Sequence, residues 1–156
     1  MQFVMAENGS LIDEIRSLFL EYARSLDFNL CFQDFDRELK DLPGEYSRPN
    51  GRLILARYNG RFVGCVGLRK LEEGVCEMKR LYVKPAYRRM GIGKELAERI
   101  ISEAMAIGYR RMRLDTISNM VEAITLYLSL GFREIEPYRP NPIKGAKYFE
   151  LIMRAD

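Results

Sequence analysis

The chain has 156 residues, of which 47% are hydrophobic and 11% aromatic, enough for one continuous core, so we expect a single domain over residues 1–156. No apolar run reaches the roughly 18 residues of a membrane helix, and the N-terminus MQFVMAENGS lacks the layout of a secretory signal. We therefore expect a cytoplasmic protein without a membrane partner. The net charge of +3 is too small to indicate nucleic-acid binding by itself.

The residue types that are missing or scarce restrict the chemistry. Histidine is absent, so the usual general base near neutral pH and the commonest transition-metal ligand are both lacking. The three cysteines, Cys31, Cys65 and Cys76, have no CxxC spacing, which argues against a disulfide framework or a zinc knuckle. We expect no metal, and any base must be a carboxylate, a tyrosine or water.

Hydrophobic periodicity predicts a strand, two helices and a hairpin in the first half of the chain. The segment QFVMA predicts a strand, and apolar residues at helical spacing predict a helix from Ser10 to Ser25 and a second from Phe32 to Leu42. RLILARY and RFVGCVGLRKL flank Asn59-Gly60, a two-residue hairpin signal. A third strand, VCEMKRLYV, follows, and the three strands together predict an antiparallel meander. Strict alternation in this third strand places one set of residues on one face of the sheet: Val75, Glu77, Lys79, Leu81 and Val83.

The second half predicts a helix over 92–107, a strand RMRLDTI, a helix NMVEAITLYLSL, and two final strands, FREI and KYFELIMR. A helix between VCEMKRLYV and RMRLDTI implies that these two strands are parallel neighbours at the centre of a mixed sheet.

A glycine-rich turn, RRMGIG, lies directly between a strand and a helix. Two glycines let the backbone approach a ligand, and the following helix presents unpaired N–H groups, so this turn suits a phosphate or pyrophosphate. A Walker loop and a dinucleotide loop both fail on spacing, since position 96 is leucine. A plain tight turn is the alternative.

At this point the chain resembles the GNAT (GCN5-related N-acetyltransferase) superfamily, through LYVKPAYRRMGIGKEL and, further on, LDT, Asn119 and LYLSLGF. The resemblance implies a mixed, mostly antiparallel twisted sheet of six to seven strands, flanked by about four helices and splayed at the central parallel pair. It also implies acetyl coenzyme A as the cosubstrate and a primary amine as the acceptor.

The resemblance assigns cofactor residues by motif position. It implies contacts to the pyrophosphate from the turn and the helix start, namely Arg88, Arg89, Met90, Gly91, Ile92, Gly93 and Lys94. It implies that main-chain groups of Leu81, Tyr82 and Val83 hold the pantetheine arm, with a bulge that splays the sheet. Asn119 is implied as a further cofactor contact, and a helix N-cap is its alternative role.

Two side chains are candidates for catalysis. Glu77 is the candidate base, directly or through water, because members of the family often carry a carboxylate on this strand; the alternative is an ion pair with Lys79 or Arg80. Tyr127 resembles the family tyrosine that protonates the departing thiolate, although it could be a core residue. A backbone N–H near Val83 would stabilise the oxyanion.

The acceptor is the least determined part. Arg52, Arg69, Tyr138 and Arg139 could form a cationic, aromatic mouth for a small amine that carries a carboxylate. A protein or peptide acceptor, a non-catalytic coenzyme A module and a nucleic-acid module stay open as alternatives, the last disfavoured because Tyr82, Tyr87 and Tyr109 form no evident stacking platform. The resemblance also admits a homodimer.

Overall fold

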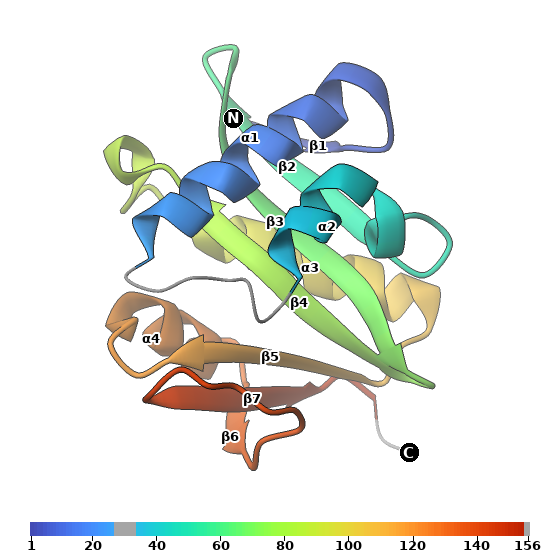
Figure 1. Cartoon of the computed structure of the whole chain (residues 1–156), viewed down its shortest axis with the longest axis vertical. Coiled ribbons are helices and arrows are strands. Elements are labelled where there is room, and N and C mark those ends of the chain that lie inside the picture. Colours follow the sequence, from blue (N-terminus) through green and yellow to red (C-terminus); the bar gives the residue numbers. More distant parts are fainter. Residues whose placement is uncertain (27–33, 155–156) are drawn as a thin grey trace.

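Seven strands form one sheet in residues 1–26 and 34–154, the part of the chain that the computed structural model describes (Figure 1). Their order in the sheet is β1-β2-β3-β4-β5-β7-β6, and only the β4 and β5 pair is parallel. This confirms the expected mixed, mostly antiparallel sheet. The bounds are β1 (Gln2–Met5), β2 (Arg52–Tyr58), β3 (Arg61–Glu72), β4 (Val75–Val83), β5 (Arg111–Ile117), β6 (Arg133–Ile135) and β7 (Ala146–Ile152).

Helices cover both faces of the sheet. Figure 1 shows α1 and α2 on one face and α3 behind it. The bounds are α1 (Gly9–Ser25), α2 (Phe35–Asp41), α3 (Ile92–Ile107) and α4 (Val121–Ser129), with short 3-10 turns η2 (Gly44–Tyr46) and η3 (Pro85–Tyr87). The predicted start of the second helix at Phe32 lies outside the described residues. Within the described part, no helix has the length and apolar character to cross a bilayer.

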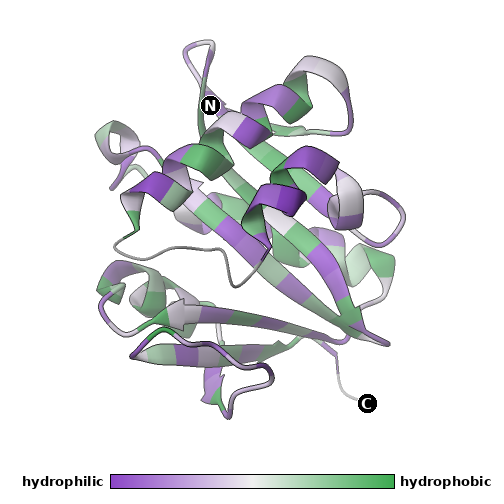
Figure 2. Ribbon diagram, viewed as in Figure 1, coloured by the Kyte–Doolittle hydropathy of each residue, from purple (hydrophilic) through white to green (hydrophobic). Residues whose placement is uncertain are grey.

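Two hydrophobic cores lie on opposite faces of the sheet, because each long helix buries one stripe of side chains. On one face α1 buries Ile15 and Phe19 against β3 and β4, and on the other α3 buries Leu96 and Ile100. Figure 2 shows hydrophilic and hydrophobic residues alternating along α1 and α2, as expected for helices that face both solvent and core. The helices that apolar spacing predicted at α1 and α3 are therefore confirmed.

The β2 and β3 hairpin forms at the predicted dipeptide. Asn59 and Gly60 both have positive φ, at 49° and 77°, and they join Tyr58 to its partner Arg61. These angles match the two-residue turn whose twist agrees with that of the strands, and Asn-Gly tolerates them well.

β4 contains a bulge and separates from β5 along part of its length. Before it, Lys79 pairs with Gly67 of β3, and after it Tyr82 pairs with Cys65, so β4 holds one extra residue. Arg80 has a left-handed φ of 60°, a conformation that costs a non-glycine residue about 1–2 kcal/mol. On the other side, β4 pairs with β5 only from Val75 to Glu77, after which the two strands separate. The predicted bulge and splay are confirmed.

The bulge also corrects the predicted alternation. Leu81 and Val83 pack with the α3 core, whereas Tyr82 packs with the α1 core. Strict alternation placed Leu81 and Val83 on the same face as Glu77 and Lys79, and this was wrong because the extra residue reverses the faces after the bulge.

An ion pair fixes the side chain of the bulged residue. The guanidinium of Arg80 donates through Nε and Nη2 to both carboxylate oxygens of Glu38 in α2, at 3.1 and 2.9 Å. It also lies over the ring of Phe35, 5.2 Å from the centroid. The hydroxyl of Tyr46 donates to the same carboxylate at 3.1 Å, so α2 and η2 are both attached to the bulge through Glu38.

We expect Gly67→Ala to lower the free energy of unfolding by about 1–3 kcal/mol, because of overpacking. A Cβ there would lie 2.7 Å from Cε1 of Tyr46, a ring that is buried and held by Glu38. Gly93→Ala is the matched control, since its Cβ has no neighbour closer than 3.7 Å and alanine suits a helix. Urea unfolding of the two variants tests this, and equal stabilities would contradict it.

We expect Glu38→Gln to destabilise the fold by about 3 kcal/mol at pH 7, because it leaves the buried guanidinium of Arg80 without its carboxylate. Burial raises the pKa of Glu38, but the hydrogen bonds and charge of Arg80 more than offset this, and the net pKa lies below the ordinary 4.5. The stabilisation is therefore present above pH 4.5 and is lost as the pH falls through the lower folded value.

Urea unfolding of wild type and variant between pH 7 and pH 3 measures this effect. The difference between the two should shrink at the acid end, whereas the exposed pair of Glu7 with Arg48 predicts little change for Glu7→Gln at any pH. A difference that stays constant with pH would exclude Glu38 as the titrating group.

Candidate functional site

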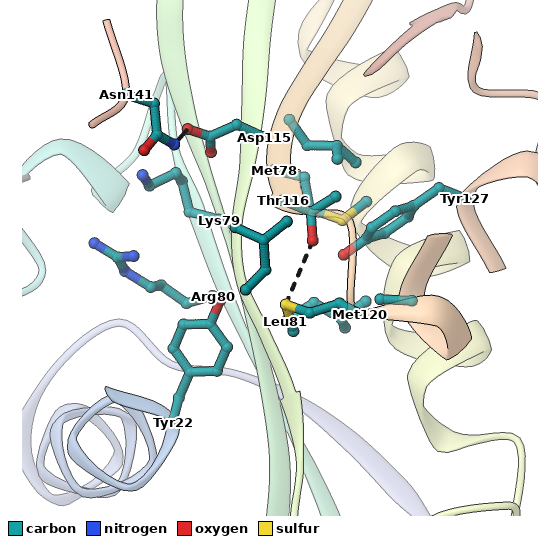
Figure 3. A pocket seen from close by; sticks show the side chains of 13 residues that line it. Tyr22, Met78, Lys79, Arg80, Leu81, Asp115, Thr116, Met120, Tyr127 and Asn141 are labelled. Carbon is teal, nitrogen blue, oxygen red and sulfur yellow. Dashed lines mark hydrogen bonds between the residues drawn. The ribbon is translucent and has the colours of Figure 1, made fainter. Parts of the chain in front are cut away.

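A pocket of about 80 Å³ lies where β4 and β5 separate (Figure 3). Residues from α1, β4, β5, α4 and the segment between β6 and β7 form its walls. They are Tyr22, Met78, Lys79, Arg80, Leu81, Leu114, Asp115, Thr116, Ile117, Met120, Ala123, Tyr127 and Asn141. The pocket therefore exists because the parallel pair is short, and it joins segments that are distant in the sequence.

Register explains why β5 leaves β4 at this point. Beyond Arg113, β5 remains paired with β7, as in Leu114 with Phe149 and Asp115 with Tyr148, while its pairing with β4 has ended. The side chains of Asp115 and Thr116 consequently line the pocket, and the β4 edge from Met78 onward has no ladder partner in β5.

Tyr127 lies on the α4 side of this pocket. Its hydroxyl end is directed toward Thr116 and the pocket (Figure 3), and its ring packs against Phe132 with the centroids 5.8 Å apart. Burial raises the pKa of Tyr127, so the hydroxyl keeps its proton at neutral pH. The ring of Tyr127 therefore packs in the core while its hydroxyl reaches the pocket, where it can donate a hydrogen bond or a proton.

Asn119 lies outside this pocket lining and is exposed. The N-cap of α4 is Met120, which makes no side-chain capping bond within the described residues, so the interpretation of Asn119 as an N-cap was wrong. A turn ends at Met120, whose N–H donates to the carbonyl of Ile117 at 3.0 Å, and it places the N-cap at Met120 and the helix start at Val121.

The glycine-rich turn ends in an uncapped helix. Gly91 is the N-cap of α3 with a φ of 80°, and as glycine it has no side chain to bind the first amides. The N–H of Glu95 makes the first helical bond, to the carbonyl of Gly91 at 3.1 Å, so the N–H groups of Ile92, Gly93 and Lys94 have no intrahelical acceptor. These groups, with the helix dipole, suit an anion.

Side chains around the turn differ in where they lie. The Ile92 side chain is buried in the α3 core, so only its backbone is open to a ligand, whereas Arg89, Met90 and Lys94 are exposed. Arg89 has a left-handed φ of 67°.

Arg88 lies against the end of β4. Its Nε donates to the carbonyl of Val83 at 2.9 Å, and its guanidinium lies 5.8 Å from the centroid of the Tyr82 ring. The hydroxyl of Tyr82 in turn donates to Glu21 of α1 at 2.7 Å. Arg88 thus links the turn to the strand that borders the pocket.

Glu77 is fully buried and is the last residue of β4 that pairs with β5. One carboxylate oxygen accepts from Nε of Arg69 at 2.9 Å, and the other accepts from the hydroxyl of Tyr138 at 2.6 Å and contacts the guanidinium of Arg139. The ion-pair alternative had named Lys79 or Arg80 as partners, but the cations in contact are Arg69 and Arg139. Glu77 is not part of the pocket lining.

Three of the four residues predicted for the acceptor therefore meet at Glu77: Arg69, Tyr138 and Arg139. Burial lowers the pKa of Arg139 to about 10, with the charge of Arg69 acting in the same direction. Arg52 lies apart, because its side chain turns to the α3 face and pairs with Glu103 at 2.9 Å.

Sequence reasoning did not place three polar residues of the pocket, Lys79, Asp115 and Asn141, in the site. Burial lowers the pKa of Lys79 to about 7, the charge of Arg80 lowers it further, and Asp115 opposes this. Asn141 donates from Nδ2 to Asp115 at 3.5 Å. Two features of the sequence could have indicated them: Lys79 lies two residues after Glu77, and Asp115 lies near the end of a predicted strand. Among the described residues, no group of His, Cys, Asp and Glu is arranged to hold a metal.

Comparison with known proteins agrees with this geometry. The model of the acetyltransferase (GNAT) family matches residues 12–132. An uncharacterised N-acetyltransferase of Schizosaccharomyces pombe is 38% identical over 91% of this chain and 88% of its own length, and the IAA acetyltransferase of Azospirillum brasilense is 35% identical over 71% and 82%.

A solved structure of a candidate streptothricin acetyltransferase from Bacillus anthracis, in complex with acetyl coenzyme A, superposes with a TM-score of 0.62 at 25% identity, over 70% of this chain and 67% of that one. The extent of the family match and the identity to the Schizosaccharomyces relative go well beyond the fold. The chain belongs to the GNAT family of acetyltransferases.

Proposed function

We propose that this chain is an N-acetyltransferase that moves an acetyl group from acetyl coenzyme A to a primary amine of a small molecule, by direct attack in a ternary complex. The observation that carries the proposal is the pocket at the separation of β4 and β5, with Tyr127 on its wall.

The residues present fit acetyl coenzyme A at two places. The amides of Ile92, Gly93 and Lys94 at the start of α3 suit the pyrophosphate, and a Cβ at Gly91 would meet nothing within 4 Å, so the turn is open to close approach. The edge of β4 has no ladder partner in β5 at Leu81 and Val83, so backbone groups there can pair with the amides of the pantetheine arm, whereas those of Tyr82 face β3. Bound there, acetyl coenzyme A supplies a thioester as the acetyl donor.

Backbone direction supports a role for Val83 in stabilising the oxyanion. The N–H of Lys84 donates to the carbonyl of Val63 in β3 at 2.8 Å. Successive residues of a strand direct their backbone groups to opposite sides, so the N–H of Val83 is directed away from β3, to the side where β5 has separated. We therefore assign to it the stabilisation of charge that develops on the thioester oxygen.

Two side chains complete the proposed chemistry. Tyr127 keeps its proton at neutral pH and gives it to the departing thiolate. Glu77 accepts the proton of the attacking amine through a water, since its carboxylate is buried and lies outside the pocket lining. Arg69 and Arg139 hold that carboxylate in place.

A small acceptor is favoured over a protein segment. The pocket of about 80 Å³ is walled by side chains of four elements, which suits a metabolite better than an extended peptide. The relative from Azospirillum brasilense is named for the acetylation of a small molecule, IAA, which agrees with a small acceptor. Turnover of peptides but of no free amine would favour the protein-acetylating alternative.

We expect acetyl coenzyme A to raise the melting temperature of the protein, since a ligand at about 100 times its dissociation constant stabilises the fold by roughly 2.7 kcal/mol. Replacing both Gly91 and Gly93 by alanine should weaken this shift, because two Cβ atoms would stand where the pyrophosphate approaches the backbone. A thermal-shift titration measures both. No shift at millimolar ligand would refute the cofactor assignment.

We expect Glu77→Gln to lower kcat by about 100-fold or more, and to change the pH dependence of kcat, because the variant has no carboxylate to accept a proton. Coenzyme A release at a series of pH values is the measurement.

Glu45→Gln is the matched control, since Glu45 accepts from the same Arg69 at 2.6 Å but is exposed. A Glu77→Gln enzyme that keeps the wild-type pH profile at reduced kcat would indicate that Glu77 only supports Arg69 and Arg139.

A further inference from the structure

The β4 bulge places two consecutive cations in one pocket. Lys79 and Arg80 both line the space between β4 and β5, and they are only 5% and 6% exposed. In a regular strand, neighbouring side chains point to opposite faces, so this arrangement depends on the left-handed backbone of Arg80. Burying two adjacent like charges is unfavourable unless anions compensate both of them.

The charge of Arg80 is compensated within the protein. Both oxygens of Glu38 accept from its guanidinium, and the ring of Phe35 covers it. These contacts fix its direction, so the positive charge of Arg80 is a permanent feature of the pocket wall.

Lys79 also has carboxylates near it. Its ammonium points toward Asp115 and Asn141 (Figure 3), and Asp115 and Glu38 favour its charged form. Burial and the charges of Arg80 and Arg69 oppose that form and prevail, which lowers the pKa of Lys79 to about 7. The electrostatic environment of this lysine therefore favours one additional negative charge.

The ammonium also has the capacity to bind another acceptor. A lysine carries three N–H donors, so Lys79 can bind an incoming oxygen while it keeps its neighbours. Asp115 is shared, since Asn141 also donates to it at 3.5 Å. The arginines predicted for this task do not line this pocket, since Arg69 and Arg139 contact Glu77 and Arg52 pairs with Glu103.

We propose that the acetyl acceptor is an amine that also carries a carboxylate, as a small amino acid does, and that Lys79 in the pocket binds this carboxylate. This inference rests on the proposed function and narrows its substrate class. In this arrangement the carboxylate pairs with the ammonium of Lys79, while the amine takes the position open to attack on the thioester.

The test is a thermal-shift screen of the protein saturated with coenzyme A, so that binding is observed without turnover. The probes are the proteinogenic amino acids, each beside its α-amide, which differs only in the lost charge. We expect at least one acid to raise the melting temperature while its amide does not.

Lys79→Met keeps an apolar stem and removes the charge, and we expect it to weaken binding of that acid by about 10- to 100-fold, as for loss of a charged hydrogen bond. Lys79→Arg should retain part of the affinity. Lys70→Met is the control, since Lys70 lies on β3 and pairs with exposed Glu73. Retained binding of coenzyme A by Lys79→Met shows that the variant is folded.

Three results would overturn the inference: no acid stabilises the protein, amides stabilise it as well as acids do, or Lys79→Met binds acid like the wild type. The proposed function is tested separately, because it fails if acetyl coenzyme A itself does not bind or no amine is acetylated, whereas this inference fails on the difference between acid and amide.

Discussion

The left-handed backbone of Arg80 is the constraint on which the site depends. It inserts one residue into β4 and reverses the faces of the strand beyond it, three residues after the pairing to β5 has ended at Glu77. Its cost of about 1–2 kcal/mol is offset by the bidentate pair with Glu38 and the contact with Phe35. An ion pair between α2 and β4 thus stabilises a strained strand, and the strained strand directs both Lys79 and Arg80 to the pocket that the short parallel pair leaves open.

Glu77 connects the pocket to the C-terminal part of the chain. Its carboxylate accepts from β3 through Arg69 and contacts Tyr138 and Arg139, which precede β7. A second link holds the same segment, since Asn141 donates to Asp115 of β5. Removal of a single partner would leave a buried charge unmatched, so these groups fix the segment beside the pocket as a unit. The orientation of the Glu77 carboxylate, the proposed base, therefore depends on Arg69 and Arg139.

The two halves of the proposed site use different parts of the chain. The α3 turn offers backbone amides, which any residue can supply, and so its requirement is for glycine and for a helix start. The acceptor side uses particular side chains from β4, β5 and the segment before β7. This difference explains why the turn can be recognised from a short motif, whereas the acceptor residues follow no contiguous pattern.

Local patterns in the sequence determined the elements and the family. Helical spacing predicted α1 and α3, Asn59-Gly60 predicted the hairpin, and the glycine turn with its following helix predicted the uncapped N-terminus. These features depend on residues that are near one another in the chain, where propensity and turn chemistry act directly.

The tertiary structure decided which charged side chains meet. Sequence alternation gave no sign that Lys79 and Arg80 share a pocket, that Arg69 and Arg139 reach Glu77, or that Arg52 lies on the opposite face. The physical reason is that one extra residue in β4 changes every face after it, and that the partners of buried charges come from strands and segments joined only by the sheet.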